Sequence, residues 1–290
     1  MQENQHLLIT GLVRDSGPHL KSEIERIENH AREIFASVDF FLVESDSTDS
    51  TQFVLNQLKK IKNNFEFVSF ESLETTFPNR IERLRFCRNQ YVQKIRADKR
   101  YSECGFILVV DFDIKNRKLN LEPIVPLLSM DAWDALFTNQ RGPYYDILAL
   151  RCDGWVESDC FQLYQELSRS MSRARAKNQA IWSRMIKIPI SAPMIEVQSA
   201  FGGLGLYRRA CFECFDYSPA TFEQFQESEH VSLHRKITLS GGKLFIVPAM
   251  TNFSFSPHNL SAYRIFRFLD KVTRSHFFKG IRNLLRRLLA

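Results

Sequence analysis

The sequence predicts an α/β fold with a mostly parallel β-sheet flanked by helices. Short apolar runs alternate with stretches of helical spacing through residues 6–113, which is the arrangement of parallel sheets. Three polar clusters, at residues 14–18, 44–50 and 111–113, each follow an apolar run. Ligands of parallel sheets bind beyond the carboxyl ends of the strands. We therefore expect the three clusters to meet in one site.

The first elements are read directly from the apolar pattern. Residues 6–13 form an apolar run that ends in the polar loop, so they are expected to be a strand. Residues 19–37 carry apolar side chains at helical spacing and predict a helix. A second strand is expected at 39–43, a helix at 49–62 after its Ser/Asp-rich cap, and a third strand at 65–70.

The next two elements lead into the most distinctive motif. Residues 80–96 predict a long, strongly basic helix, and residues 105–110 predict a fourth strand that runs straight into Asp111 and Asp113. Two neighbouring carboxylates repel one another unless a cation or hydrogen bonds compensate. A hard divalent cation, Mg²⁺ or Mn²⁺, bridging to a diphosphate is the natural compensation.

The second half is less regular. Short strands are expected at residues 133–137 and 145–150, and a basic helical stretch at 160–187. Residues 197–207 look like a strand that holds a Gly-Gly pair, and residues 243–247 predict a late strand. Without a repeat or a low-complexity linker, the simplest division is one domain over 1–258 and a C-terminal segment over 259–290.

Composition restricts the class of protein. The chain has 290 residues, of which 44% are hydrophobic and 25% charged, as in globular proteins. Its polar start and the lack of long apolar runs do not predict a signal peptide or a membrane span, so secretion is not expected. Six cysteines in a chain of this length favour reduced thiols. The pair Cys211-x-x-Cys214 lacks a second half, so zinc is not expected.

Two polar groups near the strand ends are candidate ligand contacts. Residues 44–51 cap the following helix, yet Glu44 and Asp46 cluster beside the strand end, where they would accept hydrogen bonds from a base or ribose. The basic helix carries several arginines, most of them expected in solvent, and we expect Arg88 to reach the phosphates. Arg14, after the first strand, is expected to bind the same ligand.

Taken together, these motifs resemble the GT-A fold of nucleotide-sugar-dependent glycosyltransferases. The similarity is greatest to the capsule-associated mannosyltransferase-like group, and it covers about residues 6–258. The motifs that carry it lie at residues 44–51, 84–89, 109–113, 133–136, 145–151, 199–208 and 229–230.

The resemblance implies roles for several residues. Asp111 would face the ribose or the water shell of the metal, and Asp113 would bind the metal directly. Gly202 and Gly203 would let the donor and acceptor sugars approach the backbone. His258 matches the late histidine that completes metal coordination in many such folds, and His234 is the competing candidate for that role.

The same resemblance places an acidic motif at the start of a helix near the reacting carbon. Here that motif is Glu229 followed by His230, where many members have Asp. Either residue would remove the acceptor proton, and His234, one helical turn further on, is a competing candidate. Inversion and retention of the anomeric configuration both remain open.

The C-terminal segment concentrates the positive charge. Residues 260–290 carry eight basic residues and one acidic residue, a net charge of +7 against +6 for the whole chain. Interleaved Phe, Ile and Leu predict a basic amphipathic helix on an anionic membrane surface. The alternative is a helix whose apolar face packs on the domain. Nucleic acid is not expected as a partner, because the charge is confined to this apolar segment.

The sequence therefore predicts a glycosyltransferase, in particular a hexosyltransferase that uses Mn²⁺ or Mg²⁺. Its donor is a nucleotide-diphosphate sugar, and its acceptor a lipid-linked saccharide or a surface polysaccharide of the lipopolysaccharide or capsule type; mannose is implied only by the resemblance. The expected location is the cytoplasm, peripheral on the inner face of the cell membrane. Two alternatives are a sugar nucleotidyltransferase and a non-catalytic membrane-surface protein on a degenerate transferase fold.

Overall fold

The fold is built on one eight-stranded sheet with the strand order β3-β2-β1-β4-β7-β5-β8-β6. This computed structural model describes residues 5–113, 115–218 and 227–253. The strands are β1 (His6–Val13), β2 (Ser37–Ser45), β3 (Phe65–Phe70), β4 (Cys104–Asp111), β5 (Ala135–Asn139), β6 (Ile195–Val197), β7 (Leu204–Arg208) and β8 (Leu244–Thr251).

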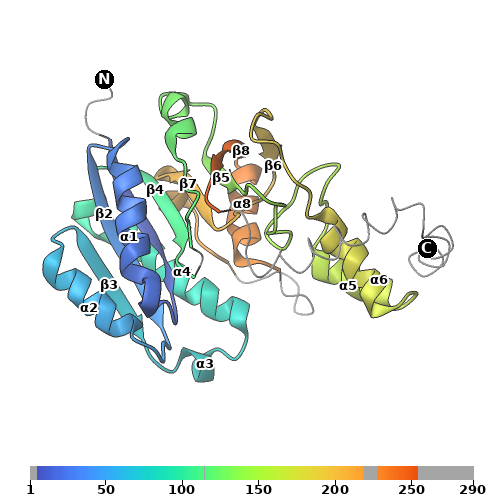
Figure 1. Ribbon diagram of the computed structural model, residues 1–290, viewed down its shortest axis with the longest axis horizontal. Coiled ribbons are helices and arrows are strands. Elements are labelled where there is room, and N and C mark those ends of the chain that lie inside the picture. The colour runs from blue at the N-terminus through green and yellow to red at the C-terminus, as the bar shows by residue number, and fades with distance from the viewer. Residues whose placement is uncertain (1–4, 114, 219–226, 254–290) are drawn as a thin grey trace, which may run out of the picture.

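Eight α-helices and three short 3₁₀ helices are described around the sheet (Figure 1). The α-helices are α1 (Gly17–Arg32), α2 (Thr51–Ile61), α3 (Leu73–Thr76), α4 (Arg80–Ala97), α5 (Cys160–Ser168), α6 (Arg173–Ala180), α7 (Ala210–Cys214) and α8 (Glu229–Leu239). The 3₁₀ helices are Lys99–Tyr101, Glu122–Leu127 and Trp182–Arg184.

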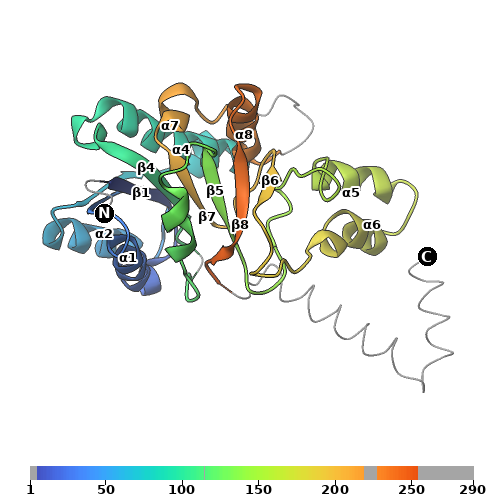
Figure 2. The same cartoon turned by 90° about the horizontal axis from the view of Figure 1, so that it is seen from above.

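The first half of the sheet is parallel and buried on both faces. β1 pairs in parallel with β2 and β4, and β2 with β3. Along β1, Leu7 and Ile9 pack with α1 and α2, whereas Leu8 packs on the opposite face with α4. Figure 2 shows these helices on the two sides of the sheet. Because helices cover both faces, the strands are apolar throughout, which made them readable from the sequence.

Antiparallel β7 joins the two halves of the sheet. It lies between β4 and β5 and pairs antiparallel with both. Just beyond these ladders, the backbone N–H of Asp111 donates to the carbonyl of Gly203 at 2.9 Å. The end of β4 is therefore fixed to the glycine turn that precedes β7.

The structure confirms the predicted α/β architecture, and its first half follows the predicted order closely. The strands expected at 6–13, 39–43, 65–70 and 105–110 are present as β1 to β4, and the basic helix is α4. α1 starts earlier than expected, at Gly17, with a proline in its first turn, a position where proline has no hydrogen bond to lose.

The second half departs from the prediction in three places. The strand expected at 145–150 is wrong: the segment turns, and the Asp146 carboxylate accepts a hydrogen bond from the N–H of Ala149 at 3.3 Å. The basic stretch at 160–187 is two helices, because Ser172 caps the start of α6 by accepting from Arg175 N. Residues 197–207 are split by Gly202 and Gly203, whose φ angles of 70° and 88° end the extended backbone.

Three further expectations concern the whole chain. The segment 259–290, with its predicted basic helix, lies outside the described residues, so the predicted division at residue 258 stays a prediction. All six cysteines are free thiols, and five of them are buried. Among the helices that the structure describes, none combines the length and the apolar character needed to cross a bilayer.

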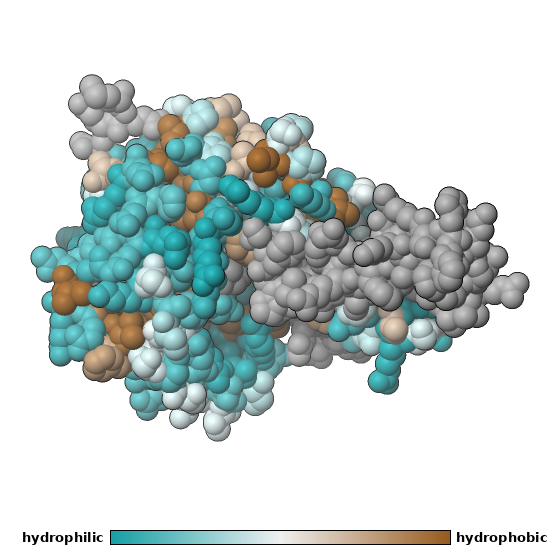
Figure 3. Space-filling view, viewed as in Figure 1, coloured by the Kyte–Doolittle hydropathy of each residue, from teal (hydrophilic) through white to brown (hydrophobic). Residues whose placement is uncertain are grey.

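The outer surface over α1 and α2 is mostly hydrophilic. In the space-filling view, apolar residues on this part of the face shown appear as separate spots (Figure 3). Single exposed apolar side chains of this kind are normal for a folded protein.

Gly11 in β1 should be the backbone position most sensitive to a side chain. A Cβ there would lie 2.0 Å from the carbonyl oxygen of Val110 on the neighbouring strand, whereas a Cβ at Gly105 of β4 would meet nothing within 4 Å. We expect Gly11→Ala to lower the free energy of unfolding by about 3 kcal/mol, in the range of overpacked cores. Gly105→Ala should change it by less than about 1 kcal/mol. Urea unfolding of both variants measures this, and equal losses would contradict it.

Candidate functional site

A large cleft opens beyond the carboxyl ends of β1, β2 and β4. Its volume is about 990 Å³, at the upper end of the usual range for small-molecule sites. It extends from Arg14, after β1, past Asp111, at the end of β4, to Trp182, after α6. The predicted meeting of the three polar clusters is therefore present, because Arg14 of the first, Ser45 of the second and Asp111 of the third all line the cleft.

Six carboxylates line this cleft. Asp15 and Glu74 form ion pairs with Arg14, and the other four are Asp111, Asp113, Asp146 and Glu229. Asp111 ends β4 and Asp113 follows it, as the sequence predicted. Asp146 comes from the turn after β5, and Glu229 begins α8. Helix α8 thus starts where the resemblance placed its acidic motif.

Arg88 of α4 is the basic residue that pairs with two of these carboxylates, Asp111 and Glu229. Its Nε donates to Glu229 Oε1 at 2.7 Å, and its Nη2 donates to Asp111 Oδ1 at 3.5 Å. Its side chain is 4% exposed, and the guanidinium lies over the rings of Phe201 and Tyr217 at 5.4 and 5.8 Å. The guanidinium therefore connects three elements, α4, β4 and α8.

Negative charge at the centre of the cleft is only partly compensated. Asp111 and Glu229 form ion pairs with Arg88, whereas Asp113 and Asp146 form none among the residues that the structure describes. Burial raises the pKa of Asp111 to about 8 against the opposing effect of Arg88, and the charges of Asp113, Asp146 and Glu229 raise it further. An elevated carboxylate pKa of this origin indicates a place that favours a bound cation.

The donor atoms fit a hard divalent cation shared with a ligand. Within the described ranges, no three His, Cys, Asp or Glu side chains form a metal-binding group. Mg²⁺ commonly uses one or two carboxylates and completes its shell with water and substrate phosphates. Asp111 and Asp113 meet that requirement. His258, the expected third ligand, lies outside the described residues.

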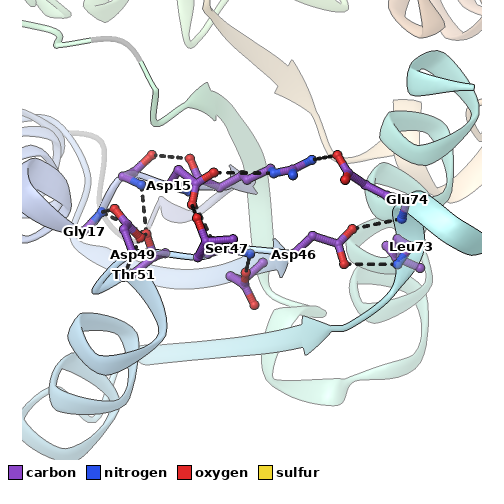
Figure 4. A network of polar contacts seen from close by, with 12 residues as sticks. Asp15, Gly17, Asp46, Ser47, Asp49, Thr51, Leu73 and Glu74 are labelled. Carbon is purple, nitrogen blue, oxygen red and sulfur yellow. Dashed lines mark hydrogen bonds and ion pairs between the residues drawn. The ribbon is translucent and has the colours of Figure 1, made fainter. Parts of the chain in front are cut away.

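The acidic loop after β2 is held by contacts within the protein. The side chain of Glu44 is buried; it accepts from the N–H of Ser47 at 2.9 Å and from Gln52 Nε2 at 3.2 Å, and it also bonds Ser69. Asp46, at a φ of 54°, accepts from the N–H groups of Leu73 and Glu74 (Figure 4). Neither residue lines the cleft. These contacts give both carboxylates a role in fixing the loop, in place of the expected base or ribose contacts.

The loop after β1 is tied to the same framework. Asp15 accepts from the N–H of Thr48 at 2.7 Å, and Asp49 accepts from the N–H of Gly17 at 3.0 Å (Figure 4). Arg14, which does line the cleft, donates to Glu74 at 2.7 Å and is 40% exposed. A fixed loop thus places Arg14 at the edge of the cleft.

The glycine pair has a conformational explanation. A Cβ on Gly202 would lie 2.7 Å from the carbonyl oxygen of Thr138, at a positive φ. The N–H of Gly202 donates to Asp146 Oδ2 at 3.0 Å, and its carbonyl accepts from Asn252 Nδ2 at 2.8 Å. Phe201, and neither glycine, lines the cleft. The pair therefore positions Asp146 and Phe201 rather than opening the backbone to a sugar.

The two histidines of α8 have different surroundings. His230 lines the cleft, stacks on Phe201 with ring centroids 3.9 Å apart, and its ring nitrogens lack hydrogen-bond partners among the described residues. His234 is fully buried; its Nδ1 pairs with Ser199 Oγ at 2.8 Å and its Nε2 with Tyr207 OH at 2.9 Å. With both nitrogens engaged away from the cleft, His234 is a core residue.

Asp146 and Phe201 were missed as site residues by the sequence analysis. Both lie in motifs that carried the resemblance, but residues 145–150 were interpreted as a strand, which hid the turn that aims Asp146 at the cleft. The available signal was an acidic residue shortly after Gly142-Pro143, a pair typical of turns.

No family model and no curated protein matches this chain. Among solved structures, it is similar to a mannosyltransferase from Pyrobaculum calidifontis in complex with GDP-Man and Mn²⁺, with a TM-score of 0.51 and 14% identity over 97% of this chain and 65% of the other. It is also similar to GalNAc-T7 with UDP, GalNAc and Mn²⁺, with a TM-score of 0.53 and 15% identity over 91% of this chain and 48% of the other. The chain thus spans less than two thirds of either protein. At such identity the likeness shows the GT-A fold, as the sequence predicted.

The buried histidines predict how stability depends on pH. Burial, and to a smaller extent the Arg88 charge, lowers the pKa of His234 to about 3, and burial also lowers the pKa of His230 well below its ordinary value. Below pH 6.5 the unfolded chain binds protons that the folded chain does not, so the free energy of unfolding decreases as the pH is lowered. Lowering the pH from 7.5 to 5.5 should therefore reduce the free energy of unfolding by about 1.4 kcal/mol for each of these histidines.

The matched variant is His234→Gln, which removes one of the two groups. The loss in unfolding free energy between pH 7.5 and 5.5 should be about 1.4 kcal/mol smaller in this variant than in the parent. Urea unfolding at the two pH values measures the difference. Identical losses would show that His234 is not a buried neutral imidazole.

Replacing the buried Arg88 should destabilise the fold much more than replacing the more exposed Arg85 of the same helix. Arg88→Met leaves the Glu229 carboxylate, which is 4% exposed, without its counter-charge, and we expect a loss of about 3 kcal/mol. Adding Glu229→Gln should restore part of that loss, because the buried charge is then gone. Arg85→Met, on the same helix and paired with the more exposed Glu82, should cost less than about 1 kcal/mol. Additive effects of the two site substitutions in urea unfolding would contradict the pairing.

Proposed function

We propose that this protein is a metal-dependent glycosyltransferase that transfers a hexose from a nucleotide-diphosphate sugar. The observation that carries the proposal is the cluster of Asp111, Asp113, Asp146 and Glu229 around the buried Arg88, in a cleft beyond the carboxyl ends of parallel strands. The two solved structures described above, which contain GDP-Man or UDP together with Mn²⁺, support the choice of donor and cation.

In this proposal Asp111 and Asp113 hold Mn²⁺ or Mg²⁺ together with the phosphates of the donor. When bound, such a cation supplies positive charge that stabilises the departing diphosphate. Arg14, at the edge of the cleft, adds charge to the same group. Arg88 donates hydrogen bonds to Asp111 and Glu229 and fixes both carboxylates in position.

Of the two candidate general bases, Glu229 is the better supported. It lines the cleft, and the hydrogen bond that Arg88 Nε donates to its Oε1 at 2.7 Å fixes the direction of the carboxylate. Desolvation and the Arg88 charge lower the pKa of His230 well below its ordinary value, which makes this imidazole a weak base at neutral pH. We assign His230, stacked on Phe201, to the wall beside the reacting sugar.

The acceptor and the location belong to the same proposal. The basic and apolar composition of residues 260–290 suits a protein that works at an anionic membrane surface. We therefore propose a lipid-linked saccharide or a growing surface polysaccharide as acceptor, mannose as the sugar suggested by the resemblance, and a peripheral position on the cytoplasmic face of the membrane.

Nucleotide binding tests the proposal. GDP or UDP should raise the melting temperature with Mn²⁺ and not with EDTA, because a ligand that binds only the folded state stabilises it, by about 2.7 kcal/mol at a hundredfold excess over Kd. Asp113→Asn should weaken this Mn²⁺-dependent binding at least about tenfold. Asp131→Asn, at a fully exposed carboxylate, should bind as the parent does.

Three outcomes of this panel would contradict the proposal. Shifts by nucleoside triphosphates but not diphosphates would favour the nucleotidyltransferase. A diphosphate shift that is unchanged in Asp113→Asn would place the ligand elsewhere. No shift under any metal condition would favour a non-catalytic protein on a transferase fold.

A further inference from the structure

The segment from α5 to β6 has an unusual distribution of charge. Between residues 167 and 195 the chain has six basic residues and no acidic residue. They are Arg169, Arg173, Arg175, Lys177, Arg184 and Lys187. None of the six forms an ion pair among the residues that the structure describes, whereas basic residues of the parallel half, such as Arg14, Lys62 and Arg88, are paired with carboxylates. Their charges are therefore not neutralised by carboxylates of the described residues, although Arg184 donates to the carbonyls of Gln179 and Trp155.

Apolar side chains are exposed in the same part of the molecule. Ile186 is 47% exposed, Ile190 57% and Met194 38%, all on the segment that leads from α6 to β6, and Phe161 at the start of α5 is 43% exposed. Basic and apolar residues together on one surface match an anionic bilayer, where cations meet the headgroups and apolar side chains enter the boundary beneath them. A nucleic acid would use the charge but would leave the aliphatic side chains without a partner.

The same elements form one end of the cleft. Phe161, Lys177, Ile181, Trp182 and Met185 line it opposite the loops that carry Arg14. Figures 1 and 2 both show α5 and α6 at the end of the molecule away from α2 and β3. A bilayer bound at this end would lie beside the mouth of the cleft, and the donor-binding loops would be on the side away from it.

We propose that residues 161–194, which we call the hairpin surface, dock the protein onto an anionic membrane. One consequence rests on the proposed function: an acceptor carried by a lipid would reach the cleft past Lys177 and Trp182. This surface is separate in sequence from residues 260–290, so the proposal adds a second membrane-binding segment to the one that the sequence predicts.

Vesicle binding tests the hairpin surface without any nucleotide. The full chain should co-sediment with phosphatidylglycerol/phosphatidylcholine vesicles and bind phosphatidylcholine vesicles much less. Arg169→Ser/Arg173→Ser/Lys187→Ser should lower the partition coefficient by up to about a hundredfold, because each basic residue near an anionic surface contributes about 1 kcal/mol. The matched control is Lys21→Ser/Lys60→Ser/Lys118→Ser, which removes the same charge from exposed positions elsewhere and should bind nearly as the parent.

A second pair of variants tests the apolar contribution. Ile186→Ser/Ile190→Ser should weaken the binding that remains at high salt, since salt screens the charges but not apolar insertion. Phe53→Ser/Ile61→Ser, at side chains of α2 that are 67% and 64% exposed, should leave that binding unchanged. Melting temperatures close to the parent value would show that all four variants fold.

The outcomes separate this inference from its alternatives. Hairpin variants that bind vesicles like their controls, while neutralising Arg264, Arg267, Lys271 and Arg274 abolishes binding, would overturn it in favour of the C-terminal segment alone. A chain that binds a single-stranded oligonucleotide and not vesicles would overturn it in favour of nucleic acid. Because no nucleotide sugar is present, either result leaves the proposed glycosyl transfer to be judged by its own test.

Discussion

The buried guanidinium of Arg88 is the constraint on which the site depends. It contacts both the end of β4, through Asp111, and the start of α8, through Glu229. A buried arginine is costly unless its charge is matched and its hydrogen bonds are made, so α4, β4 and α8 must keep their relative positions for the fold to be stable. Stability and the geometry of the cleft are thus coupled through one residue. The rings of Phe201 and Tyr217 extend the coupling to the glycine turn and to the segment after α7.

The loops after β1 and β2 show a different use of acidic residues. Most of their carboxylates accept hydrogen bonds from backbone N–H groups of a neighbouring loop or helix, so they fix the floor and edge of the cleft rather than face a ligand. Backbone donors at such turns need acceptors when water is excluded. The acidic groups left for a ligand are Asp111, Asp113, Asp146 and Glu229, and they come from three separate parts of the sequence.

This difference explains what the sequence could and could not predict. Strands β1 to β4 and helix α4 were predictable because burial on both faces leaves apolar runs with clear ends, and Asp111 and Asp113 were predictable because they follow directly on such a run. Glu44 and Asp46 look equally suitable in the sequence, but whether a carboxylate faces a cleft or a backbone N–H depends on the neighbouring loop. Asp146 and the core position of His234 depend on contacts between residues far apart in the chain, Gly202 in one case and Ser199 and Tyr207 in the other. No local pattern reports such contacts.

The two ends of the cleft are built on different physical principles. At the end formed by β1, β2 and α3, ion pairs and backbone hydrogen bonds hold every loop, which suits a site that must present fixed charges to a diphosphate. At the end formed by α5 and α6, apolar side chains are exposed, and the basic residues have no carboxylate partner among the residues that the structure describes. Surface of that kind is retained where something else covers it. A fixed donor end and a membrane-facing acceptor end would let one cleft join a soluble nucleotide sugar to an acceptor that does not leave the bilayer.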